Sequence, residues 1–188
     1  MPFQLNDDEK KFLLKLTRQT IFDFLHNKEP EEREFFSENL KTPTGAFVTL
    51  HKHKELRGCI GYVSGFKPAQ QAIADLAVSA AFNDPRFPPL TGDEFPEIDL
   101  EISILTPLET VNDISEIKIG RDGLLIKQGR RQGLLLPQVA TEYGWDVPTF
   151  LEQTCHKAGL SAKAWQEPET EIERFSAIIF SEKEFNDL

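Results

Sequence analysis

Cysteine and long apolar runs are both scarce in this chain. Its 188 residues include only two cysteines, Cys59 and Cys155, which are too few for the disulfide framework of a small secreted domain. No run of about 18 apolar residues is present to span a bilayer, and no apolar leader segment precedes a cleavage site. We therefore expect a cytoplasmic protein that has two free thiols and no membrane association.

Positive charge is also in short supply. The chain has 21 lysines and arginines against 31 aspartates and glutamates, which gives a formal net charge of −10. This balance argues against non-specific nucleic-acid binding, which depends mainly on neutralising phosphates. Short basic clusters at residues 52–54 and 130–131 are predicted to be solvated turns.

The fingerprints of common cofactor and hydrolase sites are missing as well. The sequence contains no GxGxxG, Walker A, GxSxG or HExxH motif, so we expect no nucleotide and no other cofactor. His51 and His53 share one strand face, but no nearby cysteine or carboxylate completes a ligand set. No metal site is predicted.

The residues that are present predict an α+β fold. Asn6 and Glu9 have the spacing of a capping box, and Ile98 to Ile104 alternate with polar residues as in a half-buried strand. Because helices and strands mix without strict βαβ alternation, we expect a mostly antiparallel sheet flanked by helices. The predicted helices start near residues 7, 68 and 147, and the predicted strands cover residues 47–50, 56–62, 98–104 and 172–180.

The stretch Leu56-Arg57-Gly58-Cys59-Ile60-Gly61 is the most informative part of the chain. In a regular strand, Arg57, Cys59 and Gly61 project from one face, where the arginine can stabilise a thiolate. Glycine is usually avoided inside strands, so Gly58 and Gly61 indicate a close approach by another group. Gly61 is expected to leave space beside Cys59, which predicts a small pocket with a thiol in its wall.

This hexapeptide resembles the hallmark sequence of the AMMECR family. The resemblance runs from about Gly45 to about Leu160, and its other matching segments keep the family order. Members are thought to work with Memo-like proteins and radical SAM proteins, which the resemblance implies as partners. The further matching segments are residues 45–50, 80–88, 101–103, 136–140, 144–145 and 157–160.

The resemblance also implies a main lobe that contains both termini and a second, small β-rich lobe. We assign residues 1–106 and 144–188 to the main lobe, and the meander of residues 107–143 to the small lobe. A cleft between the two lobes is then the default ligand site.

Cys59 is the candidate nucleophile, and Glu101 is the candidate general base or the partner of Arg57. The alternative for Cys59 is a compact buried residue that fits between two glycines. The alternative is that Glu101 and Ser103 lie on a solvated face of an open antiparallel sheet and have no catalytic role.

Arg86 lies in a rigid loop after a helix, where its planar guanidinium can clamp a carboxylate or phosphate. The alternative for this loop, residues 84–88, is a helix stop that anchors Phe87. The predicted substrate-binding residues are Arg57, Gly58, Gly61, Asp84, Arg86 and Ser103.

Three functions remain open at this point. The first is a cysteine-centred enzyme that acts on a small anionic or modified substrate. The second is a non-catalytic binding or scaffold protein for Memo-like and radical SAM partners, for which a small-molecule ligand is also compatible. The third is nucleic-acid binding through Phe47, Tyr62 and Phe175, which the acidic balance disfavours.

Overall fold

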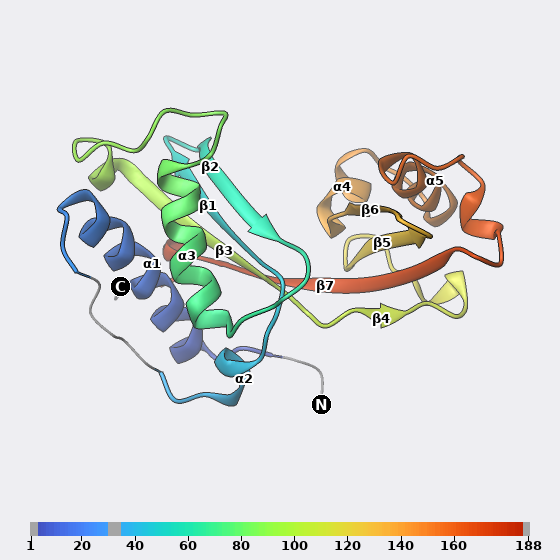
Figure 1. Cartoon of the computed structure of the whole chain (residues 1–188), viewed down its shortest axis with the longest axis horizontal. Coiled ribbons are helices and arrows are strands. Elements are labelled where there is room, and N and C mark those ends of the chain that lie inside the picture. Colours follow the sequence, from blue (N-terminus) through green and yellow to red (C-terminus); the bar gives the residue numbers. More distant parts are fainter. Residues whose placement is uncertain (1–3, 30–34, 186–188) are drawn as a thin grey trace. The chain divides into compact units, whose positions relative to one another are not determined.

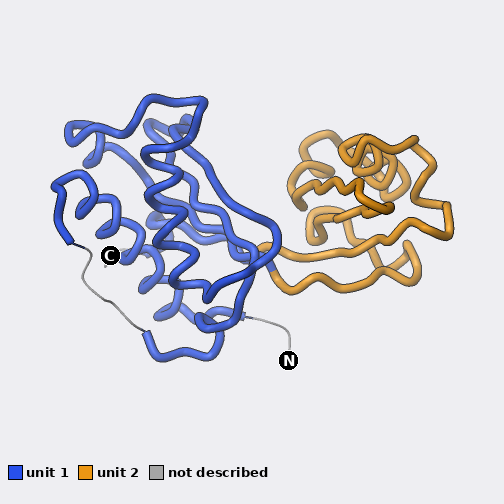
Figure 2. Tube along the Cα trace, viewed as in Figure 1, with its two compact units in different colours: residues 1–105, 178–188 blue, residues 106–177 orange. Residues whose placement is uncertain are grey.

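The computed structural model describes residues 4–29 and 35–185, and the chain divides into two compact units (Figure 2). Unit 1 takes in residues 1–105 and 178–188, and unit 2 takes in residues 106–177. The chain therefore leaves unit 1 after β3 and returns to it along β7 (Figure 1).

The described residues of unit 1 form two long helices and one short helix. Helix α1 covers Asp7–Leu25, α2 covers Glu38–Lys41 and α3 covers Ala69–Phe82. The predicted capping box of α1 is confirmed, since Asn6 and Glu9 each accept a hydrogen bond from the backbone N–H of the other. Further 3-10 turns of this unit lie at Phe95–Glu97 and Glu182–Glu184.

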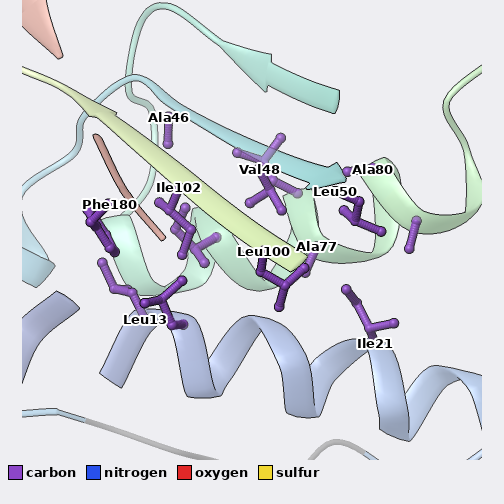
Figure 3. Packing of buried hydrophobic residues seen from close by; sticks show 14 of the residues in the cluster. Leu13, Ile21, Ala46, Val48, Leu50, Ala77, Ala80, Leu100, Ile102 and Phe180 are labelled. Carbon is purple, nitrogen blue, oxygen red and sulfur yellow. The ribbon is translucent and has the colours of Figure 1, made fainter. Parts of the chain in front are cut away.

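The sheet of unit 1 has the order β2-β1-β3 and is antiparallel throughout. Strand β1 covers Ala46–Lys52, β2 covers Glu55–Tyr62 and β3 covers Ile98–Leu105. One face packs against α1 and α3 around a core that Figure 3 shows from close by. This core includes Leu13, Ile21, Val48, Leu50, Ala77, Ala80, Leu100, Ile102 and Phe180.

The opposite side of this sheet is called the outer face here. Strand alternation and the observed pairing place the polar residues of β3 on it, together with their cross-strand neighbours. Most of these residues are only partly buried, in contrast to the core face. The outer face carries Phe47, Thr49, His51, Cys59, Gly61, Asp99, Glu101 and Ser103.

Unit 2 is built on a sheet of order β4-β7-β5-β6. Its strands are Glu109–Thr110 (β4), Asp122–Gln128 (β5), Arg131–Leu135 (β6) and the first part of Glu171–Ser181 (β7). Helices α4 (Pro137–Glu142) and α5 (Val147–Lys157) contribute to its own core, which includes Phe150 and Leu151. Two 3-10 turns lie at Ile114–Glu116 and Ala164–Gln166.

The predicted α+β class with antiparallel strands is confirmed. The unit boundary differs from the predicted lobe of residues 107–143, because residues 144–177 also group with unit 2. Helix α5 packs on the β5-β6 hairpin, where a Cβ at Gly133 would lie 2.2 Å from the backbone nitrogen of Ala158. This close approach ties α5 to unit 2. The cleft predicted between the lobes stays a prediction.

None of the helices that the structure describes is long and apolar enough to cross a bilayer.

Candidate functional site

The motif strand β2 lies at one edge of the unit 1 sheet and contains a register shift. Leu50 of β1 pairs with Gly58, but the next residue, His51, pairs with Leu56. Arg57 is therefore the extra residue of a β-bulge. The prediction that a regular strand projects Arg57 together with Cys59 fails at this bulge.

Arg57 is held by Glu94 and not by Glu101. Its Nε and Nη2 donate to the two Glu94 carboxylate oxygens at 3.0 and 2.9 Å, and Nη2 also donates to the carbonyl of Pro88. The Arg57 guanidinium lowers the pKa of Glu94 from 4.5 to about 2. Since the side chain of Arg57 is only 10% exposed, this pair is mostly buried. The expected pairing of Arg57 with Glu101 is therefore wrong, because Glu94 is the carboxylate that binds Arg57.

Asp84 and Arg86 clamp the backbone of Cys59. The Cys59 N–H donates to Asp84 Oδ2 at 2.9 Å, and Arg86 Nη2 donates to the Cys59 carbonyl at 3.0 Å. Arg86 also donates from Nε and Nη2 to the two carboxylate oxygens of Asp84. The clamp satisfies the outward N–H and C=O of an edge strand, which would otherwise be open to pairing with another chain.

The charge of Asp84 is stabilised by the same contacts. Its side chain is 2% exposed, and the Arg86 guanidinium, helped by the Cys59 amide, holds the pKa of Asp84 well below its usual range. Burial opposes this shift, so the hydrogen bonds outweigh the loss of hydration. Asp84 is thus a buried anion that supports the motif strand.

Cys59 lies in a row of three residues across the outer face. It pairs with Thr49 of β1, which in turn pairs with Glu101 of β3. The Thr49 hydroxyl donates to the Cys59 sulfur at 3.3 Å, and the thiol is free and partly exposed. Glu101 is half-buried and has no hydrogen-bond or ion-pair partner among residues 4–29 and 35–185. Thr49 therefore separates the two residues predicted to be catalytic.

The two glycines of the motif serve internal packing. A Cβ at Gly58 would lie 2.2 Å from the Ala80 carbonyl oxygen, so Gly58 allows α3 to approach. A Cβ at Gly61 would lie 2.3 Å from the Phe47 ring. The predicted close approach is confirmed, but the space expected beside Cys59 is filled by Phe47. Ser103 pairs with Phe47 across the β1-β3 ladder.

A hollow of about 200 Å³ opens further along the outer face. Glu101 connects it with the Cys59 row, and His51 and Asp99 pair across the ladder beside it. Lys183 binds Asp99 at 2.6 Å. The hollow is lined by His51, Lys54, Asp99, Leu100, Glu101, Ser181 and Lys183.

Thr49 and Glu94 were not singled out from the sequence. Thr49 sits in the alternating pattern of β1, but a sequence does not reveal which residues of the neighbouring strands it faces. Glu94 precedes a 3-10 turn in a segment without a strong pattern. Of the aromatic residues considered for base stacking, Phe175 is 2% exposed and Phe47 covers Gly61.

Metal ligands do not gather in the described part of the chain. Within residues 4–29 and 35–185, no three His, Cys, Asp or Glu side chains form a group that could hold a metal ion.

Fold and site together define an α+β protein with a free thiol in a glycine-flanked edge strand. The chain belongs to the AMMECR1 family, whose model matches residues 14–180. The resemblance seen in the motif is thereby confirmed.

The chain has relatives of similar length in several organisms. The chain is 42% identical to a protein of Thermococcus kodakarensis over 96% of this chain and 94% of the relative. It is 43% identical to a protein of Methanothermobacter thermautotrophicus over 95% of this chain and 96% of the relative. The crystal structure of an uncharacterised protein from Pyrococcus horikoshii shares the fold, with a TM-score of 0.81, 38% identity and coverage of 95% and 94%.

Proposed function

We propose that unit 1 is a thiol-dependent enzyme that acts on a small anionic or modified substrate at its outer face. The observation that carries this proposal is the row of Cys59, Thr49 and Glu101 on one sheet face. Thr49 donates a hydrogen bond to the sulfur, which supports a positioned thiol on this face. Cys59 is then the nucleophile, and Glu101, on the far side of Thr49, acts as general base on a water or substrate bound over the row.

Arg86 is the group in this proposal that binds the anionic part of the substrate. Its side chain is 54% exposed, although Nε and Nη2 are engaged by Asp84 and the Cys59 carbonyl. Nη1 has no hydrogen-bond partner in the described residues, so one edge of the guanidinium remains free for a carboxylate or phosphate. Arg86 also donates to the Cys59 carbonyl, which supports a role for it beside the residue that carries the thiol.

The other residues predicted for substrate binding have supporting roles. Asp84 positions Arg86 and the Cys59 amide, Gly58 admits α3, and Gly61 admits the Phe47 ring. Arg57 anchors the loop of Glu94. Ser103, two residues from Glu101 on the same face, stays a candidate for contact with substrate. No cofactor is invoked, and a cytoplasmic location belongs to the proposal because both cysteines are free thiols.

The test is alkylation of the native protein with iodoacetamide. Cys155 supplies an internal control, since it is fully buried and burial raises its pKa. We expect Cys59 to react in the native state, and faster than a model thiol at neutral pH, while Cys155 reacts only after denaturation. Peptide mass mapping identifies the modified cysteine. If native Cys59 is labelled no faster than Cys155, Cys59 is excluded as a nucleophile.

The alternative is a non-catalytic binding module for Memo-like and radical SAM proteins. It is favoured by the use of Gly58, Gly61 and Asp84 in internal packing. It is also favoured by Phe66, which is 69% exposed and packs its ring at a tilt against Tyr62 just beyond β2. Cys59→Ser distinguishes the two functions, because an enzyme loses turnover and a binding module keeps its partner affinity. Co-purification that finds no partner counts against the binding module.

A further inference from the structure

Two unpaired charges of opposite sign line the hollow on the outer face. Glu101 lies on one strand, β3, and Lys54 lies in the turn between β1 and β2. Within the part of the chain that the structure describes, neither side chain has an ion-pair partner, and they do not pair with each other. The remaining charges of the hollow, Asp99 and Lys183, already neutralise one another at 2.6 Å.

The backbone of the turn holds Lys54 in an unusual conformation. His53 and Lys54 have φ angles of +52° and +72°, a region that favours glycine or asparagine in two-residue hairpin turns. The surrounding contacts fix this turn, since Lys52 and His53 both bind Glu97, at 2.9 and 3.4 Å. Strained backbone that neighbouring contacts hold in place is typical of ligand sites. Here it places Lys54 at the lining of the hollow.

A half-buried carboxylate is stabilised by a hydrogen-bond donor, and an exposed ammonium pairs readily with an anion. We infer that the hollow binds the zwitterionic head of an α-amino acid, with the ligand ammonium on Glu101 and the ligand carboxylate on Lys54. His51 lies between these two groups and is available to either end of the head. The hollow of about 200 Å³ accommodates a head of this size.

The position of the hollow also sets the length of the ligand. Glu101 and Cys59 are two strands apart in one row, and neighbouring strands are spaced by about 4.8 Å, so the two side chains are separated by about 10 Å. A ligand whose head occupies the hollow reaches the thiol only through an extended side chain. This second step rests on Cys59 being the nucleophile of the proposed function, and in it Glu101 anchors the ligand ammonium instead of acting as general base. Binding of the head alone does not rest on the proposed function.

The first experiment measures binding of the head alone. L-alanine, acetate and ethylamine are titrated separately into ¹⁵N-labelled Cys59→Ser protein, and amide shifts are followed by NMR. We expect L-alanine to shift residues around the hollow, and both single-charge compounds to bind at least several-fold more weakly. Equal binding of acetate or ethylamine, or no binding of L-alanine, overturns the inference.

Two variants locate the site. Glu101→Gln is expected to weaken L-alanine binding by about tenfold, the loss of one charge-assisted hydrogen bond. Glu55→Gln is the matched control, because Glu55 is an exposed carboxylate of the same sheet outside the hollow. Unchanged affinity in Glu101→Gln, or an equal loss in both variants, removes the assignment of the ammonium to Glu101.

The second experiment tests whether a ligand whose head is bound in the hollow extends as far as the Cys59 thiol. Nε-acetyl-L-lysine has the same head and an extended arm, so it is expected to slow alkylation of Cys59 in a Cys155→Ala background, whereas L-alanine is not. If both compounds bind but neither slows alkylation, the link to the thiol is wrong and the head site stands. If Cys59 does not react at all, the proposed enzyme function is wrong. The NMR titration then still shows whether the hollow binds the amino-acid head.

Discussion

The amide of Cys59 and the carboxylate of Asp84 are joined by a hydrogen bond of 2.9 Å, although 25 residues separate them in the chain. This contact ties the motif strand to the loop that follows α3, and Arg86 closes it from the other side. The thiol at the edge of the sheet is therefore fixed by a buried charge. Its position is expected to depend on that charge.

Asp84→Asn is expected to destabilise the protein by about 2 kcal/mol, the usual cost of leaving buried hydrogen-bonding groups unsatisfied. Asparagine keeps the size of the side chain but turns an NH₂ group toward donors that need an acceptor. Urea unfolding measures the change as a lower midpoint with an unchanged slope. Asp75→Asn is the control, because the Asp75 side chain is 61% exposed and pairs with Lys67 at the surface. Equal midpoints for the two variants would contradict a buried role for Asp84.

Acid stability is expected to depend on Glu94. Arg57 lowers the pKa of Glu94 to about 2 in the folded protein, from an ordinary value of 4.5. A depressed folded pKa stabilises the protein above the ordinary value, and this stabilisation is lost as the pH falls from about 5 toward 2. Each such group adds at most about 1.4 kcal/mol per pH unit to the slope.

Glu94→Gln is therefore expected to be less stable at pH 7 and to lose less further stability between pH 5 and pH 2. Chemical unfolding at a series of pH values measures the slope. Asp93→Asn removes one exposed carboxylate from the same segment without touching Arg57, and it controls for net charge. If stability falls with pH as steeply in Glu94→Gln as in the parent protein, Arg57 does not lower the pKa of the Glu94 carboxyl.

Gly58→Ala is expected to destabilise unit 1 by about 1–3 kcal/mol, the usual cost of overpacking. The new methyl group would meet the Ala80 carbonyl oxygen at 2.2 Å, so α3 would have to move away from the sheet. Gly92→Ala is a matched control, since a Cβ there meets no atom within 4 Å. Thermal unfolding of both variants measures the difference. A Gly58→Ala protein as stable as Gly92→Ala would leave the glycine of the motif without a packing reason.

Local patterns predicted the elements of this fold, but not the partners of the site residues. Alternation identified the strand of Ile98–Leu105, and the Asn6–Glu9 spacing identified the start of α1. The bulge at Arg57 and the pairing of Thr49 with Glu101 depend on strand register, which long-range packing sets. For this reason the sequence indicated the thiol and Arg86 but assigned the wrong carboxylate to Arg57.

Thr49→Val is expected to slow alkylation of Cys59 by about threefold to tenfold, the range that corresponds to one lost hydrogen bond. Valine has nearly the shape of threonine and suits a strand, but it has no hydroxyl to donate to the sulfur at 3.3 Å. Thr49→Ser keeps the donor and should restore most of the rate, which a purely structural role for Thr49 would not explain. Rates are measured with iodoacetamide in a Cys155→Ala background. If Thr49→Val reacts as fast as the parent protein, the hydroxyl does not activate the thiol. The row of Cys59, Thr49 and Glu101 then no longer supports the proposed enzyme.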